Sequence, residues 1–343
     1  MMHVFLARRD QADQATTINH PVSKGSQARP PCLKKKRPSL QARSMTWFWT
    51  LALLCVLVSC GNTPSSSNTP PSATTPLSLP PQSATATSTT PALTSADWTT
   101  YHHDNSRAGY VAEAPNPGQL TQAWNMKLDG SVYAEPLVIG GHILVVTEND
   151  SLYSLNARTG QVLWRTNVGT PVPLSQLPCG NIDPLGITGT PVYDPATNLV
   201  FAVAEISGPS HILVGVDVNT GKVRVRRSVE PLDGDIQTHQ QRAALALSMG
   251  MVYIAYGGLD GDCGNYHGWV IASRANGQGA LLSYRVPTQR EGGIWAASGP
   301  AVDASGHIFV ATGNGAATGG TWDKTDSILR LSPTLQYEDG FAP

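Results

Sequence analysis

The stretch Glu135-Pro136-Leu137-Val138-Ile139, followed by a Gly-rich turn and the apolar run at residues 142–147, decides the fold because its order recurs along the chain. The same short strand, turn and second strand return near Pro191, Ala244 and Pro300. Counted from Pro136, these anchors lie 55, 53 and 56 residues apart. A fixed period of this size built from short strands predicts a solenoid or a propeller, although it does not identify any chemistry.

Each repeat divides into four short strands. In the first repeat they cover residues 132–139, 142–147, 151–155 and 161–164. The later repeats supply matching segments at 212–216 and 222–226, at 268–273 and 281–286, and at 327–331. Four antiparallel strands per repeat, joined by turns of Gly, Asn and Asp, predict the blade of a β-propeller and therefore an all-β fold. The composition agrees, because charged residues make up only 14% while Gly (33) and Pro (26) are plentiful.

Residues 1–60 have the features of an N-terminal extension and a lipoprotein signal peptide. A basic stretch at 34–37 precedes the apolar run at 47–58, which is too short to span a membrane comfortably. The run leads into Leu57-Val58-Ser59-Cys60, which resembles the bacterial lipobox and predicts lipid attachment at Cys60. A buried or spanning helix with a chance Cys is the alternative. The signal lies far from Met1, which fits a true start nearer Met45.

Residues 61–96 form a tract rich in Ser, Thr and Pro that cannot bury enough apolar surface to fold. We therefore expect a disordered linker there and a propeller domain at 97–343. Beyond residue 60 the chain holds 14 basic and 22 acidic residues, a net charge of −8, which argues against nucleic acid as a partner. The expected location is the outer face of the bacterial cell membrane, held by the lipid anchor, or the periplasm.

Two cysteines, Cys179 and Cys263, remain in the predicted propeller domain. In an exported domain such a pair favours one disulfide, with two unpaired buried thiols as the alternative. Cys179 lies in the loop before the first strand of the second repeat, and Cys263 lies between the second and third strands of the third. These two kinds of loop leave a blade on the same face. Both cysteines are therefore predicted to share one face of neighbouring blades, which favours the disulfide.

The best-preserved repeat carries a family resemblance. Residues 152–164, Leu-Tyr-Ser-Leu-Asn-Ala-Arg-Thr-Gly-Gln-Val-Leu-Trp, resemble the repeat of the pyrroloquinoline-quinone (PQQ) propeller superfamily, and residues 97–109 resemble the segment before its first blade. The resemblance covers roughly 97–343 and implies seven or eight blades, of which about four are visible here. The strand around Trp124 looks like a closing strand without a blade of its own. Together these features imply a chain that is incomplete at its C-terminal end, with a four-bladed ring as the uncommon alternative.

The resemblance implies one of two functional classes. Quinoprotein dehydrogenases of this superfamily bind PQQ and Ca²⁺ over the central funnel and oxidise alcohols or sugars, whereas other members bind no cofactor and act as scaffolds. The enzymes typically use a Glu, an Asn and an Asp near the calcium, a second Asp as base and, in many cases, a disulfide of adjacent cysteines. This chain has no Cys-Cys pair and no obvious Asp/Asn cluster of that pattern. No metal site is therefore predicted, and PQQ with Ca²⁺ stays a cofactor implied by resemblance alone.

Six residues are candidates for the funnel face, where a ligand would bind: Glu135, Asn181, Asp183, Gln240, Arg242 and Trp295. An Arg and a Trp at the mouth of the funnel can hold and stack a flat anionic ligand. Alternatively, Arg242 pairs with a neighbouring carboxylate and Trp295 seals the packing between blades. Asp260, Asp262 and Asn265 do not meet the spacing of a calcium-binding EF-hand loop, and a turn rich in Gly and Asp accounts for them.

The sequence thus favours a lipid-anchored, extracytoplasmic propeller that acts as a binding or scaffolding module. The first alternative is a PQQ-dependent dehydrogenase that oxidises alcohols or sugars. The second is a module that binds cell-surface polysaccharide through exposed aromatic residues. The catalytic residues, if any, and the identity of the ligand or protein partner do not follow from the sequence.

Overall fold

The computed structural model describes residues 2–7, 97–112, 114, 116–232, 235–316 and 319–343. The predicted signal segment, Cys60 and the linker at 61–96 lie outside the described residues. Within the described residues the protein is all-β, with two short 3₁₀ turns at Leu174–Gln176 and Ile236–Thr238. No helix in this part of the chain is long and apolar enough to cross a membrane.

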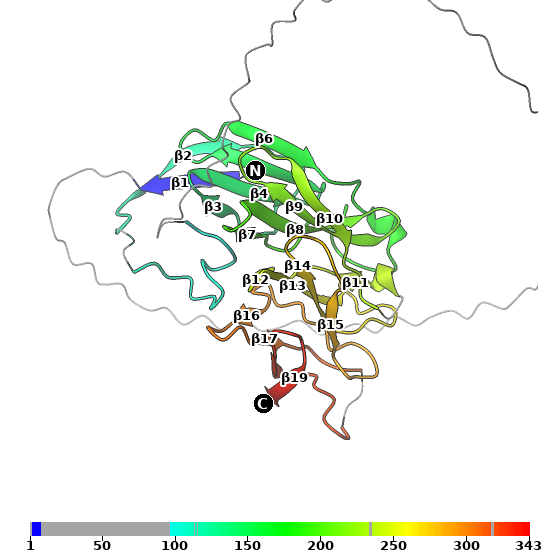
Figure 1. Ribbon diagram of the computed structural model, residues 1–343. Coiled ribbons are helices and arrows are strands. Elements are labelled where there is room, and N and C mark those ends of the chain that lie inside the picture. Colours follow the sequence, from blue (N-terminus) through cyan, green and yellow to red (C-terminus); the bar gives the residue numbers. More distant parts are fainter. Residues whose placement is uncertain (1, 8–96, 113, 115, 233–234, 317–318) are drawn as a thin grey trace, which may run out of the picture. The chain divides into compact units, whose positions relative to one another are not determined.

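Apart from a two-stranded pair, the strands of the described residues form four antiparallel sheets that follow one another along the sequence (Figure 1). Sheet 1 holds β3 (Leu137–Ile139), β4 (His142–Thr147), β5 (Ser151–Asn156) and β6 (Val162–Asn167). Sheet 2 holds β7 (Val192–Asp194), β8 (Leu199–Ile206), β9 (Ser210–Asp217) and β10 (Val223–Ser228). Each strand pairs with the next in sequence, so the predicted up-and-down blades are confirmed.

Sheet 3 has one strand more than predicted. It holds β11 (His239–Gln240), β12 (Ala246–Ser248), β13 (Met251–Gly258), β14 (Trp269–Arg274) and β15 (Leu282–Arg285). Both β11 and β12 pair with β13, at its two ends. Sheet 4 returns to four strands with β16 (Ala301–Val302), β17 (Ile308–Ala311), β18 (Ile328–Leu331) and β19 (Tyr337–Phe341).

The strand before sheet 1 differs from its prediction. The segment around Trp124 forms β2 (Leu120–Met126), as the sequence predicts, but it pairs antiparallel with β1 (Met2–Ala7) from the start of the chain. The predicted first strand of sheet 1, at residues 132–139, is shorter than expected and begins only at Leu137. Pro136 lacks the N–H that a ladder needs, and the backbone N–H of Glu135 instead donates to the hydroxyl of Thr190, 2.9 Å away.

Hydrophobic clusters fill the spaces between consecutive sheets. Residues of sheets 1 and 2 share one cluster, those of sheets 2 and 3 a second, and those of sheets 3 and 4 a third. Trp164 reinforces the first interface, because its indole N–H donates to the carbonyl of Val218 in sheet 2 at 2.7 Å. Its ring lies against Gly221, where a Cβ would come within 2.8 Å of the indole. Trp124 makes the equivalent contact with the turn of sheet 1 at Ala157.

Residues 97–107 run past the first strands of the sheets and bind several of them. The backbone of Trp98 bridges to Val138, and the carbonyl of Thr99 accepts from Tyr193 N–H at 2.8 Å. The guanidinium of Arg107 donates to the carbonyls of Leu245 (3.0 Å) and Pro300 (2.8 Å). This leading segment therefore joins all four sheets along the edge where each blade begins.

Candidate functional site

A disulfide joins Cys179, in the loop before β7, to Cys263, in the loop between β13 and β14. Their Cα atoms are 6.1 Å apart, which is within the usual range for a disulfide. The bond places loops of sheets 2 and 3 at one face of the domain, where the sequence predicts both cysteines. A Cβ added to Gly261 would lie 3.5 Å from the sulfur of Cys179, so this loop passes closely over the disulfide.

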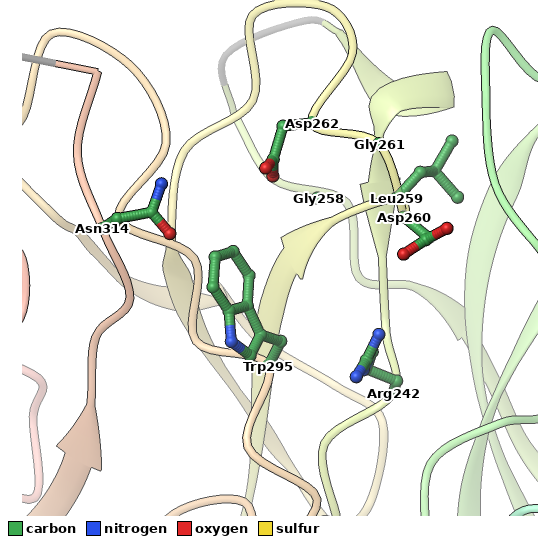
Figure 2. A pocket seen from close by; sticks show the side chains of 8 residues that line it. All are labelled: Arg242, Gly258, Leu259, Asp260, Gly261, Asp262, Trp295 and Asn314. Carbon is green, nitrogen blue, oxygen red and sulfur yellow. The ribbon is translucent and has the colours of Figure 1, made fainter. Parts of the chain in front are cut away.

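Next to the disulfide lies a pocket of about 220 Å³. Figure 2 shows its lining, which is Arg242, Gly258, Leu259, Asp260, Gly261, Asp262, Trp295 and Asn314. The residues come from the turn after β11, the loop after β13, the loop before β16 and the loop after β17. The pocket therefore lies where loops of sheets 3 and 4 meet, on the face that carries the disulfide.

Trp295 is the main aromatic surface of this pocket, and it is half-buried. Three glycines make room for its ring, because a Cβ on Gly257, Gly293 or Gly313 would come within 2.9, 2.2 and 2.3 Å of indole atoms. Any side chain at these positions would force the indole to move. The ring thus packs on bare backbone from two neighbouring sheets, which fixes its position at the pocket.

Arg242 supplies the positive charge of the site. Its side chain is exposed, and no hydrogen bond or ion pair joins its guanidinium to another residue within the described ranges. Arg242 also lines a second pocket together with Tyr133, Asn181, Ile182, Thr188 and Ala297. Arg242 therefore lines both pockets, and all five N–H donors of its guanidinium are available to a ligand.

The polar groups opposite Arg242 are partly engaged. Asp262 accepts a hydrogen bond from the hydroxyl of Tyr266 at 2.6 Å, and the amide of Asn314 donates to Glu291 at 3.1 Å. Asp260 is exposed at the rim. Among the described residues, no group of three or more His, Cys, Asp or Glu side chains is arranged to hold a metal ion.

The structure does not bring the six candidate residues together in one site. Arg242 and Trp295 line the pocket beside the disulfide, and Asn181 lines the adjoining one. Glu135 lies elsewhere, because its carboxylate accepts the indole N–H of Trp98 at 2.6 Å. Asp183 accepts the backbone N–H of Leu174 within its own loop.

Gln240 is buried in β11, paired with Gly257, and does not line either pocket. Sequence reasoning missed Asn314 and assigned Asp260 and Asp262 only to a turn. The position of these three residues within their repeats could have identified them. Each of these residues follows the second strand of its repeat and stands beside a glycine, which is where a polar side chain can reach a shared loop face.

A separate cluster of ionisable groups is buried between sheets 1 and 2. Glu148 and Asp150 come from the turn between β4 and β5, and Glu205 and His211 come from β8 and β9. Burial raises the pKa of Glu148 to about 7, and burial together with the nearby charge of Glu148 raises the pKa of Asp150 to about 8. Asp150 therefore stays mostly protonated at neutral pH, whereas Glu148 is about half ionised there.

His211 is the positive member of this cluster. Its Nδ1 lies 2.8 Å from Glu230 and its Nε2 lies 3.4 Å from Glu205. Burial opposes its charge, but the two carboxylates outweigh that effect and raise the pKa of His211 to about 10. The cluster thus places His211 between two carboxyl groups, next to carboxyls of raised pKa, in the interface between two blades.

The comparisons with known proteins agree on the architecture. Residues 105–258 match a family model described as outer membrane protein assembly factor BamB. A polyvinylalcohol dehydrogenase from a Pseudomonas species is 26% identical over 235 residues, which cover 58% of this chain and 34% of that protein. The match therefore spans about a third of the curated relative.

Two solved structures share the fold. The quinohemoprotein alcohol dehydrogenase from Comamonas testosteroni aligns with a TM-score of 0.57 and 20% identity, over 72% of this chain and 41% of that one. A europium-containing methanol dehydrogenase aligns with a TM-score of 0.54 and 18% identity, over 73% and 49%. At these sequence identities, the superpositions establish only that the strands are arranged in the same way.

Proposed function

We propose that this chain, whose described domain is a β-propeller of PQQ-like repeats, is a binding module that holds a flat, anionic ligand in the pocket between Arg242 and Trp295. One observation carries the proposal. A tryptophan ring is fixed on three bare glycines beside a guanidinium that has no partner within the described residues. Together the two groups offer a flat apolar surface and a positive charge to one ligand.

The chemistry of the pocket selects the class of ligand. The indole face offers stacking area to a planar ring, and the guanidinium forms paired hydrogen bonds with a carboxylate. Stacking on an aromatic residue contributes about 1–3 kcal/mol for a nucleobase-sized ring. The exposed carboxylate of Asp260 at the rim would repel a polyanion unless a cation lay between them. We therefore expect a bound cation to strengthen the binding of a ligand with several carboxylates.

PQQ is the second candidate that the observations favour, with the chain then forming part of a quinoprotein dehydrogenase. PQQ is a planar quinone with three carboxylates, so Trp295 and Arg242 fit its shape and charge. The similarity to a polyvinylalcohol dehydrogenase supports this candidate as well. In that case Trp295 would stack on the ring and Arg242 would hold a carboxylate. Bound PQQ would supply a two-electron acceptor for alcohol oxidation.

Equilibrium titration with PQQ, with and without Ca²⁺, tests the binding module. We expect saturable quenching of tryptophan fluorescence, with affinity at least tenfold weaker in Trp295→Ala and in Arg242→Gln. Arg158→Gln is the matched control, because Arg158 is also exposed but lies in the turn between β5 and β6, away from the pocket. Equal affinity in all four proteins would contradict the proposed site. Dye-linked oxidation of alcohols by the loaded protein would favour the dehydrogenase over a module that only binds.

We also infer that the chain is exported and anchored through a lipid on Cys60. The supporting observations are the lipobox-like residues before Cys60 and a disulfide in the domain that follows, which suits an oxidising compartment. Fractionation of cells expressing the chain should place it with membranes, and Cys60→Ser should release it. A wild-type chain found only in the soluble cytosolic fraction would contradict this inference.

A further inference from the structure

A loop between sheets 1 and 2 covers the buried cluster of ionisable groups. It joins β6 to β7, and Val172 and Leu185 within it pair through two backbone hydrogen bonds of 2.8 Å. These bonds bring the two ends of the loop side by side, and the backbone of Pro171 bridges to Ile206 of β8. We call residues 169–187 the covering loop. The covering loop is therefore a folded element that is attached to sheet 2.

Two glycines of the covering loop lie against the carboxylate of Asp150. A Cβ added to Gly186 would lie 2.9 Å from Oδ1 of Asp150, and one added to Gly169 would lie 3.5 Å from Oδ2. Each end of the loop is thus close to one of the two carboxylate oxygens. Because neither glycine carries a side chain, the loop lies directly on a group that is itself fully buried.

Few hydrogen bonds join the covering loop to the carboxyl groups beneath it. The backbone N–H of Gly186 donates to Oε2 of Glu148 at 2.7 Å. The other oxygen of Glu148 and both oxygens of Asp150 are buried without a hydrogen-bond partner within the described residues. A neutral carboxyl group tolerates such a place far better than a charged one, because a buried charge loses the hydration that it has in water. Closure of the loop therefore depends on the charge of these two acids.

The surroundings of Asp150 oppose its ionisation. The titratable and charged side chains around it come from its own turn, from β8 and β9, and from β10 and the residues after it: Glu148, Glu205, His211, Arg226 and Glu230. Burial, and then the negative charges of Glu148 and Glu205, raise the pKa of Asp150 to about 8, although Arg226 acts in the opposite direction. Burial also raises the pKa of Glu148 to about 7. Both acids therefore change charge between neutral and mildly alkaline pH.

We propose that the covering loop is a pH-sensitive latch, which stays closed while Asp150 and Glu148 are protonated and is released when they ionise. Sheets 1 and 2 and the loop between them form the latch, and neither acid lines the pocket beside the disulfide. The proposal therefore goes beyond ligand binding and does not depend on it. Since Asn181 and Ile182 lie on this loop and line the second pocket, release would also change the shape of that pocket.

The direction of the pH effect follows from where the protons are bound. In the released loop the two acids would meet water and ionise near their ordinary values, at about pH 4. In the closed loop they keep their protons up to about pH 7 for Glu148 and about pH 8 for Asp150. The closed loop therefore binds more protons in this range, and a rise in pH favours release. The tip stays attached during release, because the Cys179–Cys263 disulfide joins it to sheet 3.

Hydrogen–deuterium exchange of the whole chain, followed by mass spectrometry of its peptides, tests the latch. Samples at pH 6 and pH 9 are labelled for times that correct for the intrinsic pH dependence of exchange. In the wild type we expect the covering loop to lose at least tenfold in protection at pH 9, while β13 and β14 keep theirs. Near-UV circular dichroism at both pH values checks that the rest of the domain stays folded.

Variants that cannot ionise at these positions separate the latch from other effects of pH. In the double variant Asp150→Asn, Glu148→Gln, the loop should keep equal protection at both pH values. Asp150→Asn alone should lose less protection than the wild type, which keeps the test decisive if the double variant does not fold. Asp326→Asn is the matched control, because Asp326 is exposed in the loop before β18 and its variant should behave as the wild type does.

Three results would overturn the proposal. The first is equal protection of the wild-type loop at both pH values. The second is a loss of protection in the folded variants that is as large as in the wild type. The third is a loss that spreads equally to β13 and β14, because the whole domain would then be unfolding.

Discussion

The carboxylate of Asp150 is fully buried, and neither of its oxygens has a hydrogen-bond partner within the described residues. A charged carboxylate in that environment would cost several kcal/mol, so the group takes up a proton instead. Glu148 and Glu205 lie close by, and one carboxyl oxygen of each is also buried without a hydrogen-bond partner within the described residues. Sequence reading did not identify this cluster, because no spacing rule brings the turn after β4 next to the ends of β8 and β9.

Stability should fall as the pH rises through the range in which these acids ionise. The unfolded chain ionises Asp and Glu near pH 4, whereas the folded pKa values are about 8 for Asp150 and about 7 for Glu148. The folded state therefore binds more protons between about pH 4 and pH 8. The stabilisation is complete below that window, is lost progressively as the pH rises through it, and is gone above the folded pKa values of about 7 and 8. His211 adds a loss of the same sign above its unfolded value of 6.5.

Asp150→Asn tests this pH dependence at the acid whose pKa is raised most. The amide keeps the shape but cannot ionise, so the free energy of unfolding should depend less on pH. We expect the wild type to lose on the order of 2 kcal/mol more than the variant between pH 5 and pH 8. Denaturant midpoints at the two pH values measure the difference. Asp260→Asn, at an exposed site, should leave the slope unchanged, and an equally steep slope in Asp150→Asn would rule the explanation out.

At the scale of the elements, the contact between Trp164 and the Thr-Gly turn of the next sheet fixes the spacing of consecutive blades. Gly221 has φ of +70°, and its missing Cβ makes room for the indole. Both features are visible in sequence as the pattern of a closing Trp and a Gly-containing turn. The antiparallel units could therefore be predicted from the chain alone, and the structure confirms four strands in sheets 1, 2 and 4, with a fifth strand in sheet 3.

Gly221→Ala should be distinctly more destabilising than a glycine change that causes only backbone strain. A Cβ there would lie 2.8 Å from the ring of Trp164, in addition to the cost of a left-handed backbone. Gly208 also has a positive φ, of +93°, but nothing lies within 4 Å of its Cβ position. We expect about 1 kcal/mol for Gly208→Ala and about 2–3 kcal/mol for Gly221→Ala in chemical denaturation. Equal losses would mean that the indole contact contributes little.

The local sequence pattern did not predict where several of the candidate site residues lie in the fold. Glu135 is a candidate for the funnel face in the sequence, yet it contacts Trp98 because the leading segment runs along the first strands of the sheets. Gln240 is taken into β11, an extra strand that pairs at the far end of β13 and that no periodicity marks. Arg242 and Trp295 do reach a pocket, since both stand in loops that leave the sheets on one face. The positions of Glu135 and Gln240 depend on contacts between segments far apart in the sequence, which the spacing of nearby residues does not reveal.

At the scale of the whole molecule, the Cys179–Cys263 disulfide closes a loop with a sequence separation of 84 residues and links sheets 2 and 3. Chain-entropy reasoning assigns a cross-link of this span a stabilisation of about 4 kcal/mol. The double variant Cys179→Ser, Cys263→Ser should therefore unfold at clearly lower denaturant concentration. Reductant should lower the stability of the wild type and have no further effect on the variant. Identical midpoints for the two proteins would show that the bond contributes nothing.

The central claim is that one pocket, formed where loops of sheets 3 and 4 meet, holds a planar anion on Trp295 and against Arg242. Its most direct measurement is calorimetric titration of PQQ into the wild type, Trp295→Ala and Arg242→Gln, in the presence of Ca²⁺. The account predicts one site per chain in the wild type and at least a tenfold loss of affinity in each variant. Absence of binding to the folded wild type, or binding of the same strength in both variants, would contradict it.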